Sequence, residues 1–212
     1  MNNNGTISGK IATEPVLNHR FRGENFYYFD VESTRLSGTK DVVPVTVSEH
    51  LLKEMDLGIG KRVKITGQFR SYNLREGDKS KLILRLFANE ICADDRTEGN
   101  VNYITLTGWI CKPVILRETP LKREISDILL AVHRPCGKSD YIPCICWGRN
   151  TRFADGIEVG THIKITGRIQ SREYRKRISE DEYETKTAYE VSISKLEVIE
   201  GEECKDQVAD AE

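Results

Sequence analysis

The chain has few apolar residues for its length, and no stretch is long and apolar enough to suggest a membrane span. Of its 212 residues, 38% are hydrophobic and 31% are charged. This balance fits small domains with a large surface, either one large domain or two of about 100 residues each. The chain also lacks the apolar stretch of a secretory signal. We therefore expect a protein of the reducing cytoplasm, with no membrane partner.

Signs of catalytic chemistry are also missing. The six cysteines show no CxxC pair and no zinc-finger spacing, the four histidines are scattered, and no P-loop or dinucleotide fingerprint is present. Cys144 and Cys146 lie two apart in an apolar run, so they share one strand face, inward as small hydrophobes or, alternatively, as a metal or redox site. We predict no catalytic residue, no metal, no cofactor and no enzyme activity.

The formal net charge is only −1, but the charge is unevenly distributed. Residues 101–198 are mildly basic, whereas the chain becomes acidic after residue 198 and loses its periodicity. A cationic surface can therefore be hidden by the average. The sequence predicts that residues 201–212 form an acidic, disordered tail.

What the chain does contain is an internal repeat. The tetrapeptide KITG occurs at 64–67 and again at 164–167. The segment 41–47 (DVVPVTV) likewise matches 140–146 (DYIPCIC) in the same order and at nearly the same spacing. A period of about 100 residues indicates tandem copies of one domain and not a solenoid.

Each copy reads as five short strands with a helix between the third and fourth. The expected strands are 5–13, 26–33, 42–48, 62–72 and 81–91, then 102–111, 125–134, 141–147, 161–174 and 187–199. The expected helices are 48–55, with Ser48 as a possible cap, and 149–155. This order predicts an all-β protein of two OB-folds, which are five-stranded Greek-key barrels. The predicted domains are 1–96, 101–200 and the tail 201–212.

The outward positions of the second copy carry rings and cations. Alternation along 141–147 places Tyr141 and Trp147 on the face opposite Cys144 and Cys146. Aromatic rings interleaved with cations are typical of a surface that stacks unpaired bases and follows their phosphates. The alternative is that these rings fill the barrel core. The candidate nucleic-acid contacts are Tyr141, Trp147, Tyr174, Arg168, Arg172, Arg149, Arg134, Lys138, Arg70 and Tyr72.

A set of residues in the second copy resembles bacterial single-stranded DNA-binding proteins of the SSB family. They are Gly108, Pro113, Tyr141, Trp147, Gly148, Gly160, Gly167 and Tyr174. The resemblance implies an OB barrel that stacks single-stranded DNA on Tyr141, Trp147 and Tyr174, in replication, recombination or repair. The family's four barrels per assembly imply a homodimer, with replication or repair proteins as further partners.

The first copy and the tail depart from this pattern. Val42 and Ser48 stand where the second copy has Tyr141 and Trp147, and the acidic tail ends at Glu212 without an apolar tip. Two alternatives stay open. One is an RNA-binding or primosome-like OB-fold accessory protein, and the other is a barrel whose ring-bearing face contacts another protein.

Overall fold

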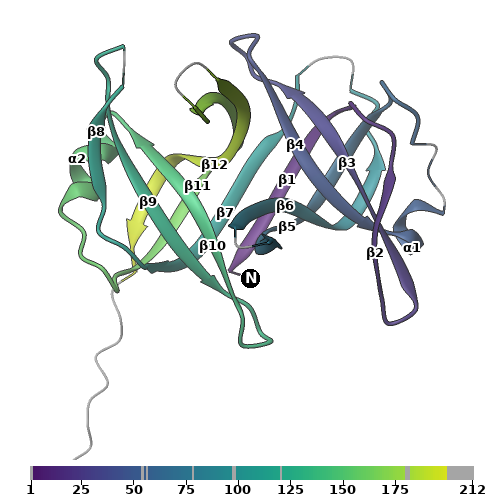
Figure 1. The fold of residues 1–212 in the computed structure, drawn as a ribbon, viewed down its shortest axis with the longest axis horizontal. Helices are drawn as coiled ribbons and strands as arrows, with labels where there is room; N and C mark the ends of the chain where they lie inside the picture. The colour runs from purple at the N-terminus through teal and green to yellow at the C-terminus, as the bar shows by residue number, and fades with distance from the viewer. Residues whose placement is uncertain are drawn as a thin grey trace, which may run out of the picture.

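The computed structural model describes residues 2–199, apart from residues 54, 56, 78, 97–98, 120 and 180–181, and it contains two β-barrels side by side (Figure 1). The predicted tail therefore lies outside the described residues. The elements of the first barrel are β1 (Asn3–Ile11), β2 (Val16–Phe21), β3 (Glu24–Thr34), β4 (Lys40–Ser48), α1 (Glu49–Leu52), β5 (Arg62–Glu76) and β6 (Lys79–Ala93). Those of the second are β7 (Asn102–Ile110), β8 (Ile115–Glu118), β9 (Glu124–His133), β10 (Ser139–Trp147), α2 (Arg149–Asp155), β11 (His162–Arg177) and β12 (Tyr183–Val198).

Strand pairing closes each half of the sheet on itself. The order β3-β4-β6-β5-β1 closes because β1 also pairs with β3, and β9-β10-β12-β11-β7 closes because β7 also pairs with β9. The β4–β6 and β10–β12 pairs are parallel, and the other pairs are antiparallel. These are two five-stranded Greek-key barrels, so the predicted tandem OB-fold class is confirmed.

Two strands were not predicted from the sequence. β2 and β8 lie at the open ends of the sheet, each paired only along one side, with β3 and β9. Nearly all of their side chains are exposed. A strand without a buried face has no apolar alternation, so its sequence gives no period-two signal.

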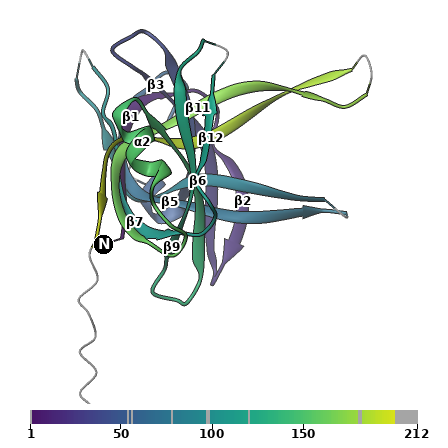
Figure 2. The same ribbon diagram turned by 90° about the vertical axis from the view of Figure 1, so that its left-hand side faces the viewer.

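The fourth and fifth strands of each copy are longer than predicted. β5 continues to Glu76 and β11 to Arg177, where the sequence suggested ends near 72 and 174. The hairpins β5–β6 and β11–β12 project beyond the barrels on the same side of the molecule (Figure 2). Residues past the barrel wall lose the apolar alternation on which the predicted bounds depend.

Of the two helices, the first is shorter than expected and the second agrees with the prediction. α1 covers only Glu49–Leu52, and Ser48 precedes it without a capping hydrogen bond from its side chain. Instead, Asn25 Nδ2 donates to Glu49 Oε2 at 3.0 Å. α2 has the predicted bounds and buries Thr151 and Ala154. Within the described part of the chain, neither helix has the length and apolar character to cross a membrane.

The glycine of each KITG segment is required by a close backbone contact. A Cβ added to Gly67 would lie 2.0 Å from the carbonyl oxygen of Phe87, and one at Gly167 would lie 2.2 Å from that of Ser192. Both glycines sit at a register shift between paired strands. The repeated tetrapeptide thus marks the register shift at which the fourth predicted strand of each barrel passes closest to the backbone of the fifth.

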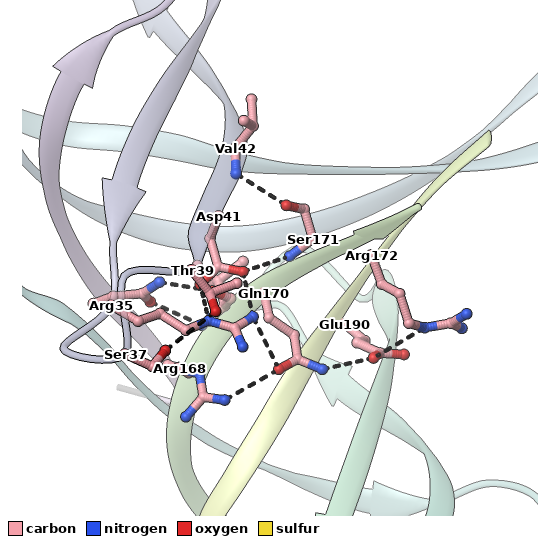
Figure 3. A network of polar contacts seen from close by, with 12 residues as sticks. Arg35, Ser37, Thr39, Asp41, Val42, Arg168, Gln170, Ser171, Arg172 and Glu190 are labelled. Atoms are coloured by element: carbon pink, nitrogen blue, oxygen red, sulfur yellow. Dashed lines mark hydrogen bonds and ion pairs between the residues drawn. The ribbon is translucent and has the colours of Figure 1, made fainter. Parts of the chain in front are cut away.

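The barrels are joined by strand pairing and by a polar clamp. β1 pairs antiparallel with β7 across the junction. Beside it, the guanidinium of Arg35 donates two hydrogen bonds of 2.6 Å to Asp41, which is fully buried. Asp41 also accepts the backbone N–H of Ser171 in the other barrel at 3.0 Å, and Ser171 Oγ accepts the N–H of Val42 at 2.9 Å (Figure 3).

The same clamp occurs a second time with the barrels exchanged. Arg134 pairs with buried Asp140, and Asp140 accepts the backbone N–H of Ser71 in the first barrel. Arg134 also donates to the Ser71 carbonyl at 3.0 Å, and Ser71 Oγ accepts the N–H of Tyr141 at 2.7 Å. The two barrels are therefore related by a pseudo-twofold axis, and each completes the other's buried carboxylate.

The clamp predicts that substitutions of two carboxylates in the β3–β4 hairpin change the free energy of unfolding by very different amounts. Asp41→Ala leaves Arg35 uncompensated and the Ser171 N–H unbonded, and we expect it to lower the free energy of unfolding by about 3 kcal/mol or more. Glu32→Ala removes only the more exposed Lys40–Glu32 pair and should change it by about 0.5 kcal/mol. Urea denaturation followed by circular dichroism measures both. Equal effects of the two substitutions would contradict a stabilising clamp.

Candidate nucleic-acid interface

The predicted ring-bearing strand, β10, alternates between a buried and an exposed face. Cys144 and Cys146 are buried in the barrel, whereas Tyr141 is 46% and Trp147 36% exposed. The rings therefore do not fill the barrel core, which was the alternative. One outward position departs from the pattern, because Ile145 is also buried on the outer side of the strand.

Tyr174 lies on the projecting part of β11, with 39% of its surface exposed. The guanidinium of Arg172 stands over its ring, 5.8 Å from the centroid, and lies 3.8 Å from Glu190 Oε1. A guanidinium on a ring face gains a cation–π contact and keeps its outer side available. Arg172 and Tyr174 thus form a cation–π pair on the projecting part of β11.

Arg168 belongs to a largely buried polar network at the base of the same strand. It approaches Gln170 Oε1 at 3.4 Å, and Gln170 donates to Glu190 Oε1 at 2.7 Å (Figure 3). Burial, followed by the nearby charge of Arg35, lowers the pKa of Arg168. Gln170 has the same strand parity as Arg168 and Arg172, but it is buried, and Arg35 of the first barrel approaches its Oε1 at 3.5 Å.

The other predicted cations of the second barrel have different surroundings. Arg134 holds the interbarrel clamp, and the hydrogen bonds it donates to Asp140 raise its pKa. Lys138, in the same turn, and Arg149, at the start of α2, are exposed. Of these three, Lys138 and Arg149 are exposed to solvent, whereas Arg134 is half-buried.

The predicted residues of the first barrel, Arg70 and Tyr72, lie in a cluster of rings and guanidinium groups on its outer face. Arg70 stands over the Phe87 ring at 5.0 Å, and Arg85 stands over Tyr28 at 4.4 Å and Tyr72 at 5.9 Å. Burial, then the charge of Arg134, lowers the pKa of Arg70.

Sequence reasoning missed Tyr28, Arg85 and Phe87. The available signal was the alternation along β6, where Arg85 and Phe87 share the parity opposite to buried Leu84 and Leu86. A cation and a ring two residues apart on an outward face form the same pattern that marked β11.

The clamp brings the two sets of predicted residues next to each other. Because the Tyr141 N–H donates to Ser71 Oγ, the first ring of β10 lies beside the strand segment that carries Arg70 and Tyr72. In the equivalent contact on the other side of the pseudo-twofold axis, Val42 stands in place of Tyr141. At this position of the repeat, a candidate surface that crosses the junction therefore has a ring in the second barrel and an aliphatic side chain in the first.

The second tryptophan is engaged elsewhere. The Trp109 ring stacks on His162 with centroids 4.2 Å apart and planes 9° apart, and it lies 4.5 Å from the His133 ring. It therefore has two imidazole neighbours, whereas the more exposed Trp147 has no ring contact of this kind among the described residues.

Comparison with known proteins agrees with this arrangement. The model of a family described as the single-strand binding protein family matches residues 101–199. The Single-stranded DNA-binding protein 3 of Streptococcus agalactiae serotype V is 31% identical over 97 residues, which are 42% of this chain and 70% of the relative. The chain belongs to the single-strand binding protein family. The Single-stranded DNA-binding protein 1 of Streptococcus pyogenes serotype M18, also 31% identical, is covered to 75% of its length by 42% of this chain.

A solved structure extends the similarity of fold to both barrels. The wild-type single-stranded DNA binding protein from Thermus aquaticus superposes with a TM-score of 0.73 over 94% of each chain, at 17% identity. The family model matches residues 101–199, in the second barrel, whereas the similarity of fold to this structure spans both barrels.

The environment of the cysteines makes a prediction for thiol chemistry. Burial raises the pKa of Cys146 to about 12 and that of Cys144 well above its usual range. Because the thiolate is the reactive form, both should resist iodoacetamide at pH 8 while exposed Cys92 and Cys136 react. Mass spectrometry of peptides from the native protein, with urea-unfolded protein as the control, measures this. Rapid labelling of Cys144 would contradict its inward position.

Proposed function

We propose that this protein binds and protects single-stranded DNA without strong sequence specificity, as a non-enzymatic component of DNA replication, recombination or repair. Bases stack on Tyr141, Trp147 and Tyr174, and guanidinium and ammonium groups neutralise phosphates. The further contacts proposed are those predicted from the sequence. They are Arg168, Arg172, Arg149, Arg134, Lys138, Arg70 and Tyr72.

The observation that carries this proposal is the exposure of large rings on one barrel of a chain of this family. Soluble proteins usually bury side chains such as tyrosine and tryptophan, and Tyr141, Trp147 and Tyr174 each leave more than a third of their surface in solvent. Base stacking uses ring faces whatever the base, at about 1–3 kcal/mol each. Tyr174 has a guanidinium beside it and Tyr141 has one in the adjoining clamp, which suits an anionic strand.

Fluorescence titration with oligo-dT tests the proposal. Binding should quench the emission of Trp147 and weaken as salt rises. Trp147→Phe should abolish most of the quenching and the matched control Trp109→Phe should retain it, because Trp109 already stacks against imidazole rings. A surface that contacts protein instead would leave the emission unchanged at every salt concentration.

Stacking also predicts the effect of deleting single rings. Trp147→Ala and Tyr174→Ala should each weaken oligo-dT binding by about 1–3 kcal/mol. Neither should lower the melting temperature much, because both rings lie outside the core. Fluorescence anisotropy of a labelled oligonucleotide measures the affinity, and calorimetry measures the stability. Unfolding on either substitution would mean that the rings are structural.

We further propose that two chains associate, which gives four barrels. Support comes from the open edge strands, where apolar side chains are exposed at equivalent places of the repeat. They are Val16 and Leu17 on β2, and Ile115 and Leu116 on β8. Multi-angle light scattering should give the mass of a dimer, and the mass of a monomer at micromolar concentration would refute this.

A further inference from the structure

A pocket on the outer face of the first barrel collects positive charge between rings. Its volume is about 250 Å³, and it is bordered by strands β2, β4, β5 and β6 and by the clamp arginine of the second barrel. The residues that matter here are Thr46, Arg70, Tyr72, Arg85, Phe87 and Arg134. Three guanidinium groups therefore approach one small space whose walls are aromatic.

Two polar groups of this pocket have no partner within the part of the chain that the structure describes. Thr46 is only 2% exposed, and its buried Oγ1 makes no hydrogen bond. The Nη1 of Arg85 is likewise buried and makes none. Leaving a buried donor unsatisfied costs about 1–3 kcal/mol, and more for a charged group. A hydroxyl and a guanidinium that both lack an acceptor are matched by an anion.

The charges around the pocket favour an anion as well. Arg134 is neutralised by Asp140. The carboxylate near Arg85 is Asp30. Burial raises the pKa of Asp30, and the positive charge of Arg85 opposes that rise. Arg70 has no carboxylate partner of its own in an ion pair among the described residues and donates to the neutral Gln68 at 2.7 Å. Three guanidinium groups against two carboxylates leave an excess of positive charge.

The second barrel shows that these features do not belong to the fold itself. In the matching register, the Arg70–Arg85 pair becomes Gln170–Glu190, and these two side chains satisfy each other at 2.7 Å. The strand partner of Tyr28 is Thr46, and the equivalent position in β10 is Ile145, which has no polar group to satisfy. The second barrel has buried unpaired donors elsewhere, at Thr151 and Arg168, but at the positions equivalent to Thr46 and Arg85 its described residues are Ile145 and Glu190, which leave none.

We infer that this pocket binds one phosphate group. At about 250 Å³ it is smaller than the roughly 300–1,000 Å³ of pockets that enclose a drug-sized ligand, which favours a phosphate over a whole nucleotide. The planar forks of Arg85 and Arg70 match phosphate oxygens, and the Thr46 hydroxyl supplies a further donor. As a contact to a DNA strand, this inference rests on the proposed function. A strand phosphodiester and a free phosphate share this chemistry.

Binding of a dT oligonucleotide by substituted full-length proteins tests the strand contact. Thr46→Val and Arg85→Gln should each weaken binding about tenfold, and Arg85→Gln should reduce the slope of log affinity against log salt by about 0.7. Lys10→Gln removes an exposed cation of the same barrel and is the matched control, expected to bind as the wild type does. Wild-type affinity and salt slope in both pocket variants would overturn the strand contact.

The threonine substitution separates a ligand role from a structural one. Removing a buried hydroxyl that has no partner should leave the melting temperature unchanged or raise it. Weaker binding together with unchanged stability supports the pocket. A fall in melting temperature would show that Thr46 serves the fold and would overturn its part in the inference.

A second experiment tests phosphate binding without DNA. In ¹⁵N-labelled protein, the Nε–H resonances of Arg85 and Arg70 should shift saturably with inorganic phosphate, and Thr46→Val should suppress the shift. If oligo-dT fails to bind the wild type, the proposed function fails, but a saturable phosphate shift still supports the pocket. A shift with the oligonucleotide alone assigns the site to a strand phosphodiester. No shift with either probe overturns the inference.

Discussion

A buried carboxylate must find hydrogen-bond donors, and in this protein neither barrel supplies enough of them alone. Asp41 takes two from Arg35 of its own hairpin and one from the backbone of Ser171 in the other barrel. Asp140 repeats the arrangement with Arg134 and Ser71. Because an unpaired charge in the interior is so costly, the relative position of the barrels is fixed to within the tolerance of a hydrogen bond.

This constraint also positions the candidate surface. Of the residues that receive the clamp, Ser71 lies between Arg70 and Tyr72 on β5, and Ser171 directly precedes Arg172 on β11. The hydrogen bond from the Tyr141 N–H to Ser71, which helps to join the barrels, also holds Tyr141 beside the segment of β5 that carries Arg70. A surface that crosses two domains usually depends on how rigidly they are joined, and here the joint and the surface share residues.

The repeat has kept its framework and changed its outward positions. Clamp residues and the KITG glycines are duplicated because each is buried against the backbone of a neighbouring strand or barrel. The outward positions differ, with Val42 against Tyr141 and Arg85 against Glu190. At these positions the second barrel thus presents an exposed ring and the first presents guanidinium groups held against rings.

The sequence was sufficient for the features that depend on alternation and repetition. Period-two patterns placed Cys144 inward and Tyr141 outward, and the repeated KITG predicted two barrels. It did not predict β2 and β8, because edge strands with exposed side chains carry no alternation. It also gave no sign that Arg134 serves a buried carboxylate, because that role depends on the facing barrel.

Stacked arginines explain why the first barrel is suited to hold charge in place. A free arginine side chain loses about 2 kcal/mol of rotamer entropy when it is fixed. Arg70 on Phe87 and Arg85 on Tyr28 have already lost much of this freedom in the folded chain. Binding of an anion therefore costs less side-chain entropy here than it would at exposed lysines, because the folded barrel already holds these arginines in place. Under the proposed function, the exposed Lys138 and Arg149 would instead attract a strand over longer distances, so rapid encounter and fixed contact would fall to different residues.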